Sequence, residues 1–309
     1  MNTANTALKP YVALGKRELW EHRSFWLVQL VVAGLLTLVF IGFAITLIYA
    51  HYNGFVSVDP SGLRGSGGAQ TFMKLIMAST GPFNVVLIFL VSFYLIDTLT
   101  ADRRDRSILF GRSLPVSDTA TVLSKLFTAM VTAPAIMLVV AIAFLIVSGI
   151  IWGIAFLVIG TNPFLLFHPL SAILALLTLT WALVAQSLWL LPFYGWFMLC
   201  SAWAKRMAWG WVILIPLGIM ALEGIVFQTS YFGGMIGRHI AGLADLLVGR
   251  GGIVIRADSH AIMPVHHAQV MTLGSVTEFM FRPEMLIGLI IGSVFVAGAV
   301  WLRHNRNEI

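Results

Sequence analysis

Residues Trp26 to Ala50 read WLVQLVVAGLLTLVFIGFAITLIYA, a run that contains no Asp, Glu, Lys or Arg. A transmembrane helix needs about 20 mostly apolar residues, so this run is long enough to cross a bilayer. It is also too long for the apolar core of a signal peptide, and we therefore expect a retained membrane anchor.

Five further apolar runs of comparable length follow, at residues 82–98, 122–151, 170–199, 208–227 and 285–302. The run at 122–151 contains Pro134, a residue that membrane helices tolerate when neighbouring helices satisfy the freed carbonyl. The run at 170–199 is longer than a bilayer needs, so we expect it to tilt or to project from the lipid. The pattern predicts an all-α membrane protein with six transmembrane helices in a single domain over residues 1–309.

The composition agrees with this prediction. The chain is 59% hydrophobic and 10% charged, and its mean hydropathy is +0.92. A soluble domain is about 25% charged, because its surface faces water. Disordered, collagen-like and disulfide-stapled proteins are excluded by the same numbers, and the lone Cys200 cannot form an internal disulfide.

The positive charges predict the orientation. With the N-terminus inside, 13 of the 19 Lys and Arg residues fall on the cytoplasmic side and 6 on the other side. Because positive residues stay cytoplasmic, we expect both termini inside a multi-pass protein of the cytoplasmic (inner) membrane. The net charge of +6 is then mainly a topology signal. We expect no nucleic-acid partner, since no basic segment interleaved with aromatic residues forms a separate soluble domain.

The N-terminal segment, residues 1–25, has helical periodicity. Its apolar face carries Leu8, Tyr11, Val12, Gly15 and Leu19, while Lys16, Arg17, Glu18 and Glu21 lie largely off that face. This pattern predicts an amphipathic helix in the membrane interface before the first span. The helix is either a functional elbow or an anchor that only sets the orientation.

The cytoplasmic segment between the second and third spans, residues 99–124, is rich in charge. Residues 107–113 can form a short helix that presents an apolar triplet. Pro115 then pushes Leu114 out of the helical region, and Ser117 or Asp118 can cap the next helix. Two interpretations remain open: a docking element held at the membrane face, or a solvated loop whose Arg residues only enforce the topology.

The residue pattern of this segment is similar to that of a known family. An acid–Arg–Arg–Asp–Arg–Ser stretch begins at Asp102, Ser-Leu-Pro-Val-Ser-Asp ends at Asp118, and Lys125 opens the next span. This resembles the permease subunits of type-2 ATP-binding-cassette (ABC) exporters, in which the same loop contains a coupling helix that seats in a groove of the cytoplasmic ATPase. The resemblance implies a coupling role for Asp102, Arg103, Arg104, Asp105, Arg106, Ser107, Leu114, Pro115, Ser117 and Asp118.

The resemblance also implies partners. The chain has no G-x-x-x-x-G-K-[ST] phosphate loop, so ATP and Mg²⁺ would bind a separate ABC ATPase, present in two copies per complex. Six spans form half of a translocation path, so we expect a second permease copy, identical or closely related. We expect the chain itself to be no enzyme, to carry no cofactor and to contact membrane lipid.

Two outer segments lie opposite the charged loop. Residues 51–80 contain several glycines, so we expect a loop whose first half is flexible. Residues 228–283 carry two stretches of helical periodicity, separated by Gly-Arg-Gly-Gly at 249–252. They predict two amphipathic or re-entrant helices at the outer mouth, which the resemblance also implies. The alternative is a small loop that only protects the dimer from outside.

Polar residues within the apolar runs are candidates for a substrate path. Glu223 is the one acid well inside a run, and burying it costs a few kcal/mol, so it should face the bundle or water. It would contact substrate or pair with a polar group; Gln186 and Tyr194 are weaker candidates. His260, His266 and His267 lack a metal-ligand spacing, so we expect no metal site. An ion-coupled secondary transporter built around Glu223 and a membrane-embedded metal-dependent enzyme are the alternative functions.

Overall fold

The computed structural model describes residues 23–56, 65–104, 117–165, 168–204, 207–248 and 271–305. Helices account for almost all of these residues, and no strand occurs among them. Six helical stretches are long and apolar enough to cross a membrane. The prediction of an all-helical, multi-pass fold with six apolar helices is therefore confirmed. The amphipathic helix predicted within 1–25 lies almost wholly outside the described residues.

The elements follow one another along the chain as a series of helices. They are α2 (Ser24–Tyr52), α3 (Gly65–Arg104), α5 (Asp118–Phe127), the π-helical turn η2 (Thr128–Thr132), α6 (Ala133–Val158), the 3₁₀ turn η3 (Pro163–Leu165), α7 (Pro169–Trp189), α8 (Leu191–Trp203), α9 (Ala208–Leu222), the π-helical turn η4 (Glu223–Phe227), α10 (Tyr231–Val248), α11 (Leu273–Met280) and α12 (Pro283–Asn305).

Helix α3 is much longer than the span predicted at 82–98. It begins at Gly65 and passes through Pro82 without ending there. The second half of the loop predicted at 51–80 is therefore helical, and this part of the prediction was wrong. Phe83, directly after the proline, is fully buried, and its carbonyl accepts a hydrogen bond from the buried Gln29 amide of α2. Such packing against neighbouring helices stabilises a helix despite a proline.

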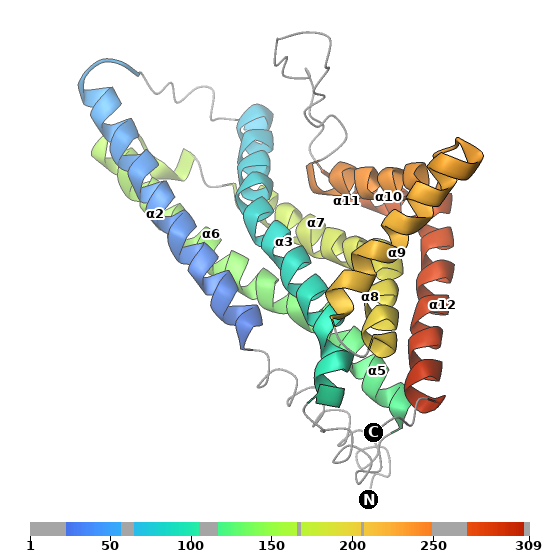
Figure 1. Ribbon diagram of the computed structural model, residues 1–309. Helices are drawn as coiled ribbons and strands as arrows, with labels where there is room; N and C mark the ends of the chain where they lie inside the picture. The colour runs from blue at the N-terminus through green and yellow to red at the C-terminus, as the bar shows by residue number, and fades with distance from the viewer. Residues whose placement is uncertain are drawn as a thin grey trace, which may run out of the picture.

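The single long span predicted at 170–199 is wrong in a different way. The chain forms two helices, α7 and α8, which meet at Leu190. Pro192 lies at the start of α8, where its missing N–H and fixed φ are tolerated, whereas in a continuous helix it would break the backbone hydrogen bonding. The run at 170–199, which is longer than a bilayer needs, is thus divided into two helices, and α7 lies obliquely to α8 (Figure 1).

Helices α8 and α12 pack backbone to backbone. A Cβ atom added to Gly195 would lie 2.6 Å from the Gly292 carbonyl oxygen. One added to Gly292 would lie 2.7 Å from the Leu191 carbonyl carbon. Without an apolar driving force between helices in lipid, close van der Waals contact through small residues is a main source of helix association. These two glycines therefore hold α12 firmly against α8.

The helix ends divide between the two ends of the bundle. The end of α3, the start of α5 and the end of α12 lie together, and α10 lies across the bundle near its opposite end (Figure 1). We call the first of these the charged end. Helices α10 and α11 fall within the predicted outer segment 228–283, but residues 249–270 lie outside the described residues, so a re-entrant arrangement stays a prediction.

Candidate functional site at the charged end

The predicted coupling segment enters and leaves the bundle at the charged end. Asp102 lies in the last turn of α3, and Ser117 and Asp118 open α5. Arg103 and Arg104 belong to the last turn of α3, although their side chains lie outside the described part of the structure. Asp105, Arg106, Ser107, Leu114 and Pro115 lie outside the described residues.

Ser117 fixes the start of α5. Its backbone is extended (φ −71°, ψ 153°), and its Oγ accepts a 3.1 Å hydrogen bond from the Ala120 N–H. This is the N-cap geometry, which satisfies an N–H group that has no partner within the helix. Asp118 follows in the first turn, where the helix dipole favours a negative charge. Ser117 is therefore the capping residue of the two that the sequence offered.

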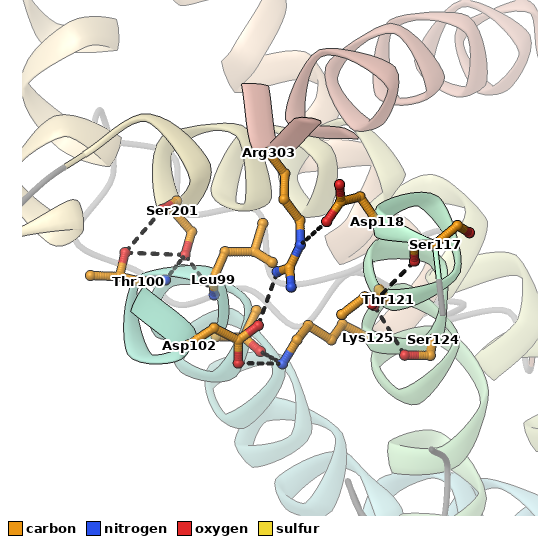
Figure 2. Close-up of polar contacts among 11 residues, drawn as sticks. Leu99, Thr100, Asp102, Ser117, Asp118, Thr121, Ser124, Lys125, Ser201 and Arg303 are labelled. Carbon is orange, nitrogen blue, oxygen red and sulfur yellow. Dashed lines mark hydrogen bonds and ion pairs between the residues drawn. The ribbon is translucent and has the colours of Figure 1, made fainter. Parts of the chain in front are cut away.

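Four charged side chains from three helices form what we call the charged cluster: Asp102, Asp118, Lys125 and Arg303 (Figure 2). Arg303 of α12 lies between the two acids, with Nη1 3.0 Å from Asp102 Oδ2 and Nε 3.1 Å from Asp118 Oδ1. Lys125 Nζ lies 3.3 Å from Asp102 Oδ1. Both ends of segment 105–116 are thereby tied to the C-terminal helix.

The cluster is partly buried and balanced in charge, with Asp118 its most exposed member at 33%. The Lys125 side chain is 6% exposed and the Arg303 side chain 14% exposed. The Lys125 ammonium also donates a 2.8 Å hydrogen bond to the Thr98 hydroxyl. Two acids face two bases, so the charges of the cluster compensate one another. Breaking one member of such a network is far more costly than breaking an exposed ion pair.

Helix α8 holds the end of α3 from another side. The Ser201 hydroxyl is fully buried and accepts hydrogen bonds from the Leu99 N–H (3.0 Å) and the Thr100 N–H (3.1 Å). The Thr100 hydroxyl donates a 3.0 Å bond back to the Ser201 carbonyl (Figure 2). The last turns of α3 are thus fixed to α8 as well as to the charged cluster.

Sequence reasoning included Asp102 and Asp118 in the site but missed Arg303. In the sequence, Arg303 is one of the 13 positive residues that predict the cytoplasmic side. A signal was present, because Asp102, Asp118, Lys125 and Arg303 all lie at the predicted cytoplasmic ends of apolar runs. Opposite charges at one membrane face are candidates for pairing. The sequence pattern does not say, however, which helices are neighbours there.

The structure places Glu223 in a local role. Its carboxylate accepts hydrogen bonds from the Thr229 hydroxyl (3.0 Å) and from the N–H groups of Tyr231 and Phe232 (2.5 and 2.9 Å). These are the first two residues of α10. Glu223 thus pairs with polar groups, one of the two outcomes expected from the sequence, and caps the helix that follows.

Gln186 and Tyr194 lie apart from Glu223, within the packed helices. Tyr194 is 3% exposed and belongs to the main apolar core. Gln186 is also 3% exposed, and its Oε1 atom accepts no hydrogen bond within the described part of the chain. The structure does not gather the three substrate-path candidates into one site, and their role in a path stays a prediction.

Metal ligation finds no support in the described ranges. No three His, Cys, Asp or Glu side chains in those ranges lie close enough together to hold a metal ion. His260, His266 and His267 lie outside them.

Comparisons of the chain with protein-family models, with curated proteins and with solved structures find no match.

Proposed function

We propose that the chain is the membrane-spanning permease subunit of an ATP-driven exporter of the type-2 ABC kind. In this proposal, segment 105–116 docks on a separate ATPase, and ATP binding and hydrolysis there drive substrate across the cytoplasmic membrane. The observation that carries the proposal is the convergence of both ends of this segment on one charged cluster. The resemblance of residues 102–125 to the coupling loop of that family supports it.

The charged cluster suits a loop that must transmit force. A loop attached through flexible ends would absorb the displacement of a docked partner. Here Asp102 and Asp118 are held by Arg303, and the last turns of α3 are also held by Ser201. A satisfied and partly buried polar network makes its attachment points rigid. A push on the loop would then displace the helices themselves.

The remaining parts of the proposal follow from what the chain lacks and from its charge. It has no phosphate loop, so the complex would contain two copies of an ABC ATPase that binds ATP and Mg²⁺. A second permease, identical or closely related, would complete the path. The charged end would face the cytoplasm, together with both termini, because most Lys and Arg residues lie on that side.

The contacts of Glu223 weigh against an ion-coupled transporter built on this residue. Both carboxylate oxygens are engaged by donors at the start of α10. A coupling carboxylate must exchange a proton or an ion during transport, whereas this one holds a helix end. The exporter is therefore the function that the described geometry supports best.

The test is capture of the ATPase. We expect an ABC ATPase to co-purify with the tagged chain when the chain is purified from its native membrane in mild detergent. The purified complex should hydrolyse ATP. The double variant Asp105→Arg/Arg112→Glu should still fold and reach the membrane but lose the ATPase, because it inverts two of the three charges of the loop. Arg256→Glu/Asp258→Arg, the same kinds of change in the outer segment, is the control. Equal capture by wild type and both variants would refute the docking role.

A further inference from the structure

We propose that Arg303 is a positioning residue that makes helix α12 follow the loop. By joining α12 to both ends of segment 105–116, it carries a displacement of the loop into the C-terminal helix. This inference rests on the proposed function for its purpose, while the mechanical link itself is a property of the chain alone.

The guanidinium group is suited to this link. Nε bonds Asp118 and Nη1 bonds Asp102, so two edges of one planar group engage two helices at once. Arginine presents its N–H donors in a rigid fork, and charge-assisted bonds of this kind are short and strong. Lysine offers one compact ammonium and lacks this fixed geometry. The position therefore requires the shape of arginine as well as its charge.

Lys125 provides a contrast within the same cluster. It lies on α5 and bonds Asp102 and Thr98, both on α3. It therefore ties α5 to α3, the two helices that flank the loop, and these contacts do not involve α12. Removing Lys125 costs the cluster one positive charge, as removing Arg303 does. Only the loss of Arg303 removes its bonds to both acids, which leaves α12 the exposed His304 ring, 3.6 Å from Asp118 Oδ2.

A movement of α12 would reach the opposite end of the bundle. At Gly292 the backbone of α12 lies so close to Leu191 of α8 that an added Cβ would clash with it, so the two helices are in direct backbone contact there. One turn earlier, a Cβ on Gly288 would lie 3.2 Å from the His239 ring of α10 and 3.3 Å from Pro192. Helix α12 thus contacts the charged cluster near one end and α10 near the other. Close-packed interfaces of this kind transmit displacements.

The link can be measured on the chain alone. Spin labels would be placed at Thr119 on α5 and Trp301 on α12, both exposed, in a Cys200→Ala background reconstituted in lipid nanodiscs. We expect a narrow distance distribution for the parent chain and a smaller broadening for Lys125→Gln, which leaves both Arg303 contacts in place. We expect a broader and longer distribution for Arg303→Gln, since the Arg303–Asp118 bond is lost and only the exposed His304 ring remains near Asp118.

Other outcomes decide against the inference. An unchanged distribution in Arg303→Gln overturns it, and so does equal broadening in Lys125→Gln, which would indicate a general loss of the cluster. If Arg303→Gln fails to fold, Arg303→Lys keeps the charge without the fork. Its distribution should then lie between those of the parent and a disrupted chain, and one identical to the parent overturns the inference.

A second measurement separates this inference from the proposed function. With the ATPase bound, addition of ATP should shift the distance from Trp301 to a label on the outer helix α10 in the parent chain. In Arg303→Gln, the ATPase should still bind and this shift should be lost; a shift equal to that of the parent overturns the inference. Failure to capture any ATPase would count against the proposed function. The distance measurement in nanodiscs, which needs no ATPase, would still test whether Arg303 joins α12 to α5.

Discussion

Glu223 shows how a residue can be identified from the sequence while its contacts are not. An acid within an apolar run indicates a special environment, because leaving it in lipid is costly. Its partners, however, are created by a reversal of the chain. Gln228 adopts a left-handed conformation (φ 51°, ψ 33°), and the start of α10 is thereby brought back onto the carboxylate. Periodicity along the sequence contains no sign of this turn.

Replacing Glu223 tests the capping role. The first N–H groups of a helix have no partner within it, and a negative charge there is also favoured by the helix dipole. Glu223→Ala should therefore destabilise the start of α10, because the Tyr231 and Phe232 N–H groups lose their acceptor. Hydrogen exchange at Tyr231 and Phe232 should become faster, as measured by mass spectrometry on the protein in nanodiscs.

Thr229→Val is the matched comparison for this prediction. It removes one donor to the carboxylate but leaves the two backbone hydrogen bonds. It should therefore have a smaller effect on exchange in α10 than Glu223→Ala. If exchange in α10 is the same in Glu223→Ala as in the parent chain, Glu223 is not a cap and a role in transport becomes the better explanation.

At the scale of helices, α10 docks onto the break between α7 and α8. The His239 ring stacks on Trp189, with ring centroids 4.2 Å apart and planes 5° apart. The Trp189 indole N–H donates a 2.8 Å bond to the His239 carbonyl, and His239 Nε2 lies 2.7 Å from the Trp189 carbonyl. That carbonyl belongs to the last residue of α7, where a helix leaves acceptors unpaired. Helix α10 therefore compensates for the break.

Two glycines of α10 allow a controlled test of this docking. A Cβ on Gly242 would lie 2.5 Å from the Trp189 ring, whereas a Cβ on Gly237 would have nothing within 4 Å. A Gly→Ala change inside a helix normally stabilises it by about 0.5–1 kcal/mol. We expect this gain for Gly237→Ala and a net loss of stability for Gly242→Ala, because the ring must move. Thermal unfolding in nanodiscs and hydrogen exchange in α10 would measure both, and the docking is refuted if both variants become more stable.

The six apolar helices were predictable from the sequence, while their ends and breaks were not. Length and hydropathy depend on each run alone, so 26–50 and 208–227 closely match the helices observed. Whether a helix continues through a proline depends on the residues that pack around it. Pro82 lies within one long helix beside the buried Gln29 contact, while Pro192 begins a new helix next to the α10 dock. The two prolines have no local sequence feature that separates these outcomes.

The candidate site was also predictable only in part. Charge at the ends of apolar runs indicated the loop and two of the four members of the charged cluster. Arg303 can pair with both acids only because α12 lies beside α3 and α5. Arg303 is 185 residues from Asp118 and 201 residues from Asp102 along the sequence. Long-range neighbours of this kind are fixed by close packing, such as the Gly195–Gly292 contact, which sequence periodicity does not encode.

For the whole molecule, the even number of apolar helices and the distribution of charge give one orientation, which thiol labelling can test. In a Cys200→Ala background, cysteines would replace Thr119 at the charged end, and Asn53 and Tyr231 after α2 and at the start of α10. All three positions are exposed.

Because Lys and Arg concentrate at the charged end, that end should stay in the cytoplasm. A membrane-impermeant maleimide applied to intact cells should then label Asn53→Cys and Tyr231→Cys, and reach Thr119→Cys only after the membrane is opened. Labelling of Thr119→Cys alone would reverse the orientation and place the charged cluster out of reach of a cytoplasmic ATPase. Labelling of Asn53→Cys and Tyr231→Cys from opposite sides would contradict the six-helix topology itself.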